Sequence, residues 1–286
     1  MRKIINFLTF CFLLAAVSAV WGQAPNDPWG AMNSAFAKAA GPQVNLEEDY
    51  YLGRAVTANI LAMPNYRLYT SNPELTNYLN RICQTIVINS PNAMVFNGFH
   101  VALLNSQEYN AFATPGGHIL LTRGLVEAAP SEDAIAALIA HELAHITLRH
   151  AAEIIEGMSF TNELDDMAGR AASLTGNSKA AQQVQALRQS VSPIMDAMIK
   201  NGFSQEQEFA ADNKALELLN AAGYDPRALI TMLQLLQRVQ SNRSGGFNST
   251  HPTPAARINN VNRTIGRYSA NTTQASRQQR FNNFSK

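Results

Sequence analysis

The chain has 286 residues, of which 46% are apolar and 15% charged, so its length and composition are those of a globular protein with one large domain or two small ones. Without Arg2 and Lys3 the net charge is −1, and from Asn259 onward five basic residues occur with no acidic one. The body before that point therefore carries a charge of about −6, which argues against nucleic acid as the main partner.

Residues 1–19 have the pattern of an export signal. Two basic residues precede the apolar run Ile4–Val20, and small side chains at 17–19 suit a signal peptidase. The run is short for a bilayer span, so we expect cleavage near Ala19, with an uncleaved anchor as the alternative. No later segment is apolar enough to cross a membrane, so we expect no transmembrane helix after cleavage. Of the two cysteines only Cys83 would remain, which leaves no internal disulfide.

The elements follow in the order helices, strands, helices. A loosely patterned N-terminal segment, 20–45, comes first. A stretch rich in Val, Phe and Leu predicts a strand over 93–105. Residues 111–124 predict another strand, bent or ended at its Pro-Gly-Gly. Apolar spacing and capping residues predict helices over 45–63, 72–89, 131–155, 204–223 and 224–240, and a loop over 244–258 that leads into a short helix. The order predicts a mostly helical α+β fold with a small antiparallel sheet beside the helix that starts at Ser131.

The stretch IAHELAHITLRH, residues 139–150, holds three of the six histidines. It contains the pattern H-E-x-x-H on a predicted helix, where residues four apart share one face, so His141 and His145 are placed to hold one Zn²⁺. Zinc lowers the pKa of a bound water toward about 7, and the adjacent Glu142 is placed to take the proton of that water. A chance match is the alternative, but the capped, amphipathic helix favours a zinc site.

A catalytic zinc site needs a third protein ligand and an open fourth position. The metzincin spacing would place Gly and His where Leu148 and Ala151 stand, which excludes that class. His150 would lie about 140° around a continuous helix from His145. We therefore interpret it as a histidine that contacts a ligand from outside the metal or packs near the site, rather than as a ligand.

Two glutamates remain as candidates for the third ligand. Glu208 begins a well-capped helix, and Asp212 stands one turn later, where it can accept the free N–H of a ligand histidine. Glu208 is therefore the favoured ligand. Glu163, which lies 18 residues after His145, is the alternative.

The motif HELAHITLRH, followed by EFAAD, AAGYDP and STHPTPAARI, resembles the HtpX/BepA-like minigluzincin metallopeptidases, relatives of the CAAX prenyl protease. NAFATPGGHILLTRGLV resembles the segment of that family before the zinc helix, so the resemblance covers about residues 47–262. It implies a zincin-like fold and a zinc endopeptidase with one zinc per chain, bound by His141, His145 and Glu208, and with Glu142 as the base. The family's membrane helices and C-terminal tetratricopeptide array are not expected here.

The resemblance also implies a role in quality control of envelope proteins. The expected partners are unfolded or misassembled proteins, among them outer-membrane proteins or their assembly machinery. Together with the export signal, this predicts the periplasm of a Gram-negative cell. We expect a metallopeptidase domain over 46–262 and a polar, disordered tail over 263–286.

Three further features bear on mechanism. An edge strand at Ala113, Thr114, Pro115, Gly116 and Gly117 is predicted to bind an extended peptide through backbone hydrogen bonds, with a core hairpin as the alternative. His251 is predicted either to occupy the fourth position on zinc and keep the enzyme latent or to stabilise the oxyanion, with a helix-capping loop histidine as the alternative. Arg257 is predicted to pair with a carboxylate near the site, and residues 157–200 are a candidate lid.

A chaperone-like protein that holds unfolded envelope proteins without routine cleavage is the alternative function. The presence of Glu142 favours an enzyme, because a scaffold needs no base. A structural zinc site would need four ligands, usually with Cys, and fits poorly.

Overall fold

The computed structural model describes residues 46–90, 95–156, 202–240, 247–251, 253–269, 271 and 273–284, which belong to one unit of the chain. The predicted export signal, the segment 20–45, the alternative ligand Glu163 and the candidate lid at 157–200 lie outside these residues.

A three-stranded sheet is formed by β1 (His100–Leu104), β2 (Ala111–Thr114) and β3 (His118–Thr122), in the order β1-β3-β2. β3 is antiparallel to β2 but parallel to β1, so the prediction of an antiparallel sheet is wrong for one of the two pairs. The chain reverses after β1 and again at the 3₁₀ turn η1 (Pro115–Gly117), so β3 runs in the direction of β1 and inserts beside it. β2 is therefore an edge strand, as predicted.

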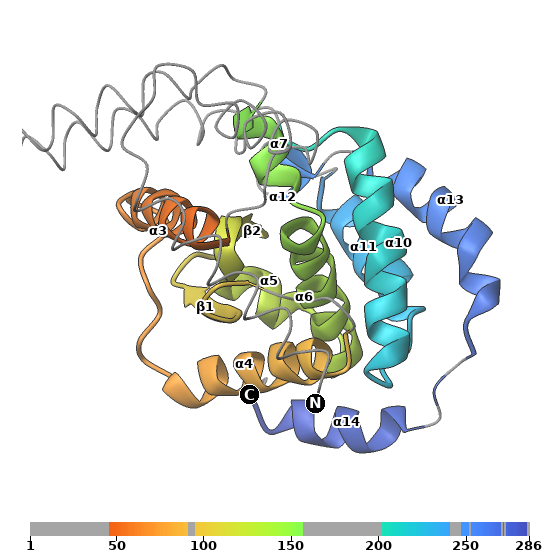
Figure 1. Cartoon of the computed structure of the whole chain (residues 1–286). Helices are drawn as coiled ribbons and strands as arrows, with labels where there is room; N and C mark the ends of the chain where they lie inside the picture. The colour runs from red at the N-terminus through yellow and green to blue at the C-terminus, as the bar shows by residue number, and fades with distance from the viewer. Residues whose placement is uncertain are drawn as a thin grey trace, which may run out of the picture. The chain divides into compact units, whose positions relative to one another are not determined.

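Helices cover the sheet and account for most of the described residues, which confirms the mostly helical α+β class. They are α3 (Leu46–Leu61), α4 (Pro73–Ile88), α5 (Arg123–Ala128), α6 (Glu132–Thr147), α7 (His150–Glu156), α10 (Gln205–Ala221), α11 (Ala228–Gln240), α12 (Phe247–Thr250), α13 (Pro254–Thr264) and α14 (Gln274–Asn282), with a 3₁₀ turn η3 (Ile265–Arg267). In Figure 1, α6 lies between the sheet on one side and α10 on the other.

The central position of α6 follows from its sequence. The Ser131 hydroxyl accepts a hydrogen bond from the backbone N–H of Ala134 at 3.1 Å and caps the first turn. Apolar residues surround the rest of the helix, and nearly every residue from Glu132 to Ile146 is buried. A helix that is apolar on all sides is stable only inside a protein, and this one carries the H-E-x-x-H motif into the core.

The predicted helix over 131–155 is in fact two helices. α6 ends at Thr147, Arg149 takes a left-handed conformation with φ 58°, and α7 begins at His150. Glycine is the usual residue at such a helix end, so nothing in the sequence marked the break. The Arg149 guanidinium instead donates two hydrogen bonds of 3.1 Å to the Asp49 carboxylate of α3.

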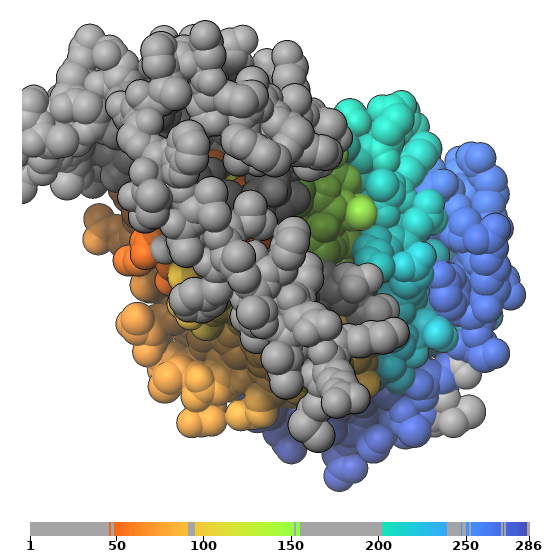
Figure 2. Space-filling view, viewed as in Figure 1, coloured from red at the N-terminus to blue at the C-terminus, as the bar shows by residue number. Residues whose placement is uncertain are grey.

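The prediction of a disordered tail over 263–286 is wrong for the residues that the structure describes. α14 packs against α6, and its residues Arg277 and Phe281 are buried. The Arg277 and Arg280 guanidinium groups pair with the carboxylates of Asp133 and Glu132 at the start of α6. The basic residues that made the tail look solvated are therefore the ones that anchor it. Figure 2 shows α14 beside α4 at the base of the molecule.

No helix in the described part of the chain has both the length and the apolar character that a bilayer span requires.

Candidate active site

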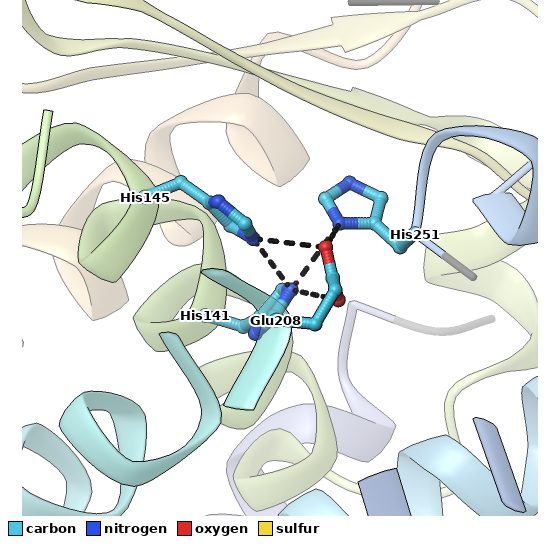
Figure 3. Close-up of side chains that lie close together, drawn as sticks. All are labelled: His141, His145, Glu208 and His251. Atoms are coloured by element: carbon cyan, nitrogen blue, oxygen red, sulfur yellow. Dashed lines mark hydrogen bonds and ion pairs between the residues drawn. The ribbon is translucent and has the colours of Figure 1, made fainter. Parts of the chain in front are cut away.

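Four buried side chains from three parts of the chain meet at one point: His141 and His145 on α6, Glu208 in the first turn of α10, and His251 directly after α12. One nitrogen or oxygen of each lies within 4.8 Å of the others. His141 Nε2 is 3.1 Å from His145 Nε2 and 3.3 Å from His251 Nδ1, and Glu208 Oε1 is 3.4 Å from His145 Nε2. Figure 3 shows the four groups pointing toward one another.

This spacing fits a zinc ion. Ligands at 2.0–2.1 Å from a tetrahedral Zn²⁺ lie roughly 3.3 Å apart. Imidazole nitrogens and a carboxylate are the donors that zinc takes in catalytic sites. Three buried imidazoles lie next to a carboxylate, with ring nitrogens at hydrogen-bond distance from one another. Few partners other than a metal ion would satisfy all of these nitrogens at once. The residues present therefore fit the metal.

Asp212 and Arg257 lie directly behind the ligand atoms. The Asp212 carboxylate is 3.1 Å from His141 Nδ1, the nitrogen that faces away from the cluster. Arg257 donates to both Asp212 oxygens at 2.9 and 2.7 Å, and its Nη1 is 2.7 Å from Glu208 Oε2. Burial alone would raise the pKa of Glu208, but the charges of Arg257 and His251 hold that pKa well below its usual range. Glu208 is thus a carboxylate in the folded protein.

Glu142 differs from the other acids of the site. It is fully buried, yet neither carboxylate oxygen has a hydrogen-bond partner among the described residues. The imidazole of His251 lies close to it, with Nε2 3.6 Å from Glu142 Oε1. Burial raises the pKa of Glu142. A buried carboxylate without partners beside a metal site has the character of a general base.

His251 contacts both the ligand group and Glu142. Its Nδ1 lies 2.9 Å from Glu208 Oε1, while its Nε2 faces Glu142. The ring stacks on Phe247 with centroids 4.1 Å apart, and its backbone N–H donates to the Phe247 carbonyl at 2.7 Å. Among the predicted roles, this geometry fits the fourth metal position.

All five residues predicted to bind substrate are buried: Ala113, Thr114, Pro115, Gly116 and Gly117. Thr114 Oγ1 lies 3.0 Å from Thr57 Oγ1 and donates to the Gly53 carbonyl, so the turn packs on α3. No hydrogen bond or ion pair within the described residues joins these five to the metal-binding group.

The outer edge of β2 is nevertheless connected to the site. The register with β3 turns the backbone groups of Ala111 and Ala113 toward the outer edge of the sheet, since ladder hydrogen bonds alternate along an antiparallel pair. On this edge the Phe247 N–H donates to the Tyr109 carbonyl at 2.7 Å. The segment that carries His251 is therefore attached to the start of the edge strand.

The sequence interpretation placed His150 near the site but did not indicate two contacts of His145. The Phe203 ring stacks on the His145 ring with centroids 4.0 Å apart, and His150 Nδ1 is 2.9 Å from His145 Nδ1. Phe203 directly precedes Ser204, the cap of α10. An apolar residue at that position commonly packs against the helix start, so the sequence did contain a signal for the packing of Phe203. The contact of His150 was hidden by the break after α6.

An H-E-x-x-H helix, a glutamate from a later helix and a buried base define a zinc metallopeptidase site. The sequence matches the model of Peptidase family M48 over residues 72–265, and the chain belongs to this family. The predicted family, type of enzyme and zinc cofactor are thereby confirmed.

Curated relatives give the same result. The chain is 30% identical to the Beta-barrel assembly-enhancing protease of Escherichia coli K12 over 190 residues, 66% of this chain and 38% of the relative. It is 26% identical to the Mitochondrial metalloendopeptidase OMA1 of Schizosaccharomyces pombe over 220 residues, 76% of this chain and 61% of the relative. It is 26% identical to the Metalloprotease LoiP of Escherichia coli K12 over 156 residues, 54% of this chain and 58% of the relative. The chain thus spans less than two thirds of the length of each.

Proposed function

We propose that the protein is an exported zinc endopeptidase of the Gram-negative periplasm that cleaves unfolded or misassembled envelope proteins. The observation that carries this proposal is the buried Glu142, whose carboxylate has no hydrogen-bond partner among the described residues, beside the group His141, His145, Glu208 and His251. A relative whose name refers to β-barrel assembly supports outer-membrane proteins or their assembly machinery as partners. The export signal predicted at 1–19 supports the location.

In this proposal His141, His145 and Glu208 hold the zinc. When bound, zinc supplies a Lewis acid that polarises the scissile carbonyl and acidifies a water molecule. Glu142 takes the proton of the attacking water and delivers it to the leaving amine. Asp212 accepts the Nδ1–H of His141 and fixes which nitrogen faces the metal, and Arg257 orients Asp212 and Glu208.

His251 keeps the enzyme latent in this proposal. A catalytic zinc needs an open position, and His251 Nδ1 fills the fourth corner of the group. His251 Nε2 also faces Glu142. The same ring therefore fills the fourth ligand position and lies against the base. Activation therefore requires that His251 move out, and the alternative role at the oxyanion would follow once it has moved.

The substrate would bind as an added strand on β2. The Ala111 N–H already donates to Asn110 Oδ1 at 2.9 Å. The outward carbonyl of Ala111 and the outward backbone groups of Ala113 would bind the substrate without reading a particular side chain, which suits unfolded substrates. Pro115, Gly116 and Gly117 would form the end of this binding edge, with Thr114 fixing the turn on α3. Because these residues are buried, binding at this edge also requires a rearrangement.

A chaperone-like protein is the second candidate function, and the position of His251 at the fourth corner of the metal-binding group favours it. It would hold unfolded envelope proteins while His251 stays in place, and would cut them rarely.

The test compares the mature wild type with Glu142→Gln and His251→Ala in casein cleavage, with zinc content measured on each sample. We expect loss of cleavage by about 10²–10⁴-fold in Glu142→Gln with zinc retained. Faster cleavage is expected in His251→Ala. If all three proteins bind one zinc and none cleaves casein, the chaperone-like function is favoured. If none binds zinc, the proposed metal site is wrong.

A further inference from the structure

We propose that His150 is a positioning residue for the zinc ligand His145, and that the left-handed residue Arg149, fixed by Asp49 of α3, brings it there. The inference rests on the zinc site proposed above. It gives a role to the third histidine of the motif and links α3 to the metal centre.

The break between α6 and α7 makes this contact. On a continuous helix, residues five apart lie about 140° apart, and His150 would point away from His145. Because Arg149 is left-handed, the chain turns at that residue and His150 folds back. His150 Nδ1 thereby reaches His145 Nδ1 at 2.9 Å, and both rings are buried.

The direction of the hydrogen bond follows from which nitrogen of His145 faces the metal. His145 Nε2 lies 3.1 Å from His141 Nε2 and 3.4 Å from Glu208 Oε1, inside the ligand group. A neutral imidazole that binds zinc through Nε2 carries its proton on Nδ1. His145 Nδ1–H therefore donates to His150 Nδ1, as the outer N–H of a ligand histidine donates to a carboxylate or carbonyl in other zinc sites.

The two ligand histidines on α6 thus have different acceptors. His141 Nδ1 meets the charged carboxylate of Asp212, whereas His145 Nδ1 meets the imidazole of His150. Each acceptor fixes the ring orientation of its ligand. Phe203 stacks on the face of His145 but offers no acceptor, so His150 supplies what packing alone cannot.

Asp49 and Arg149 hold the turn. A side chain other than glycine is disfavoured at positive φ, so this conformation needs support from tertiary contacts. The bidentate pair of Arg149 with Asp49, with both N–O distances 3.1 Å, supplies such support from α3.

The test is a matched pair of variants, His150→Asn and His150→Leu. The Oδ1 of Asn stands two bonds from Cβ, as His Nδ1 does, so His150→Asn keeps an acceptor near the same place. Leu places a methyl group there and has a similar size. Zinc affinity is measured by competition with a chromophoric chelator, and folding by thermal melting. His100→Leu, on an exposed histidine of β1, serves as the control.

We expect His150→Leu to weaken zinc binding by about 10–100-fold, and His150→Asn to stay close to wild type. In the zinc-loaded wild type, nuclear magnetic resonance should detect a slowly exchanging Nδ1–H of His145, retained in His150→Asn. Equal zinc affinities for His150→Asn and His150→Leu would overturn the proposal. A fast-exchanging Nδ1–H of His145 in the wild type would also overturn it. This second measurement does not depend on whether a variant folds. If the wild type binds zinc, neither of these two outcomes would contradict the proposed function.

Discussion

At the scale of single residues, Arg257 compensates two buried carboxylates. It is 1% exposed and contacts Asp212 and Glu208, which are both fully buried. Removal of one partner from a buried ion pair leaves an uncompensated charge and costs about 3–5 kcal/mol. We therefore expect Arg257→Leu to lower the free energy of unfolding by about that amount in zinc-free protein, measured by urea denaturation. Bound zinc should restore part of the loss, because it brings positive charge to Glu208.

The control is Arg263→Leu, an exposed arginine on the same helix α13, which should change the stability by less than about 0.5 kcal/mol. A small effect of Arg257→Leu in the absence of zinc would mean that Arg257 does not compensate the two carboxylates.

Cys83 gives a prediction on pH. The thiol is fully buried on α4, and burial raises its pKa from 9.0 to about 12. A raised pKa in the folded state stabilises the protein below pH 9 and loses this contribution as the pH rises toward 12. The native protein prepared without residues 1–19, which leaves Cys83 as its one cysteine, should thus react with a disulfide reagent at pH 8–10 far more slowly than the same chain unfolded in urea. Equal rates would show that the thiol is accessible.

The site was predictable where a local sequence pattern marks its residues. His141, Glu142 and His145 follow from helical spacing, and Glu208 with Asp212 from a capped helix. The orientation of His251 was not predictable, because its ring stacks on Phe247 and this contact depends on how α12 packs. The contact of His150 depends on one left-handed residue that the sequence does not mark.

At the scale of elements, the close approach of α3 to the turn η1 depends on Gly53. A Cβ added there would lie 1.7 Å from the Pro115 carbonyl oxygen. Within a helix, Ala is ordinarily more favourable than Gly by about 1 kcal/mol. We expect the clash to reverse this, so Gly53→Ala should destabilise the protein by about 1–3 kcal/mol in urea denaturation.

Gly266→Ala is the matched control, since nothing lies within 4 Å of its added Cβ, and it should be nearly neutral. A stabilising effect of Gly53→Ala would contradict the packing described here.

α14 is held to α6 by two ion pairs of different character. The Arg277 side chain is 9% exposed and pairs with the buried Asp133, whereas the Arg280 side chain is 52% exposed. Glu132, the partner of Arg280, also accepts from the hydroxyls of Tyr78 and Tyr224. We expect Arg277→Leu to cost about 3–5 kcal/mol and Arg280→Leu about 1 kcal/mol or less in urea denaturation. Similar costs would show that the burial of the arginine does not decide the strength of the pair.

The types of the elements were predictable, but the pairing of the strands and the packing of the helices were not. Asn72 and Ser131 cap their helices as their sequences indicate, because a cap is a local interaction. The parallel pairing of β1 with β3 depends on which strand the chain returns to, and α14 on an acidic surface supplied by α6. Local polarity alone therefore made a docked helix look like a disordered tail.

At the scale of the whole molecule, we expect the fold not to depend on the metal in the way a zinc finger does. The hydrophobic core of α4, α6, α10 and α11 is extensive, and Arg257 already compensates two of the acids at the site. We expect removal of zinc with a chelator to leave a folded protein of lower stability. Zinc at 100 times its dissociation constant should add about 2.7 kcal/mol to the free energy of unfolding.

Urea denaturation followed by circular dichroism, with zinc and with chelator, measures this difference. Glu142→Gln should keep the full effect of zinc because Glu142 is placed beside the metal and is not a ligand, whereas His145→Ala should lose most of it. If the chelated wild type instead unfolded completely, the zinc would hold the fold together, as structural zinc does in small domains. A zinc that adds stability without being required for folding is consistent with a site kept for chemistry.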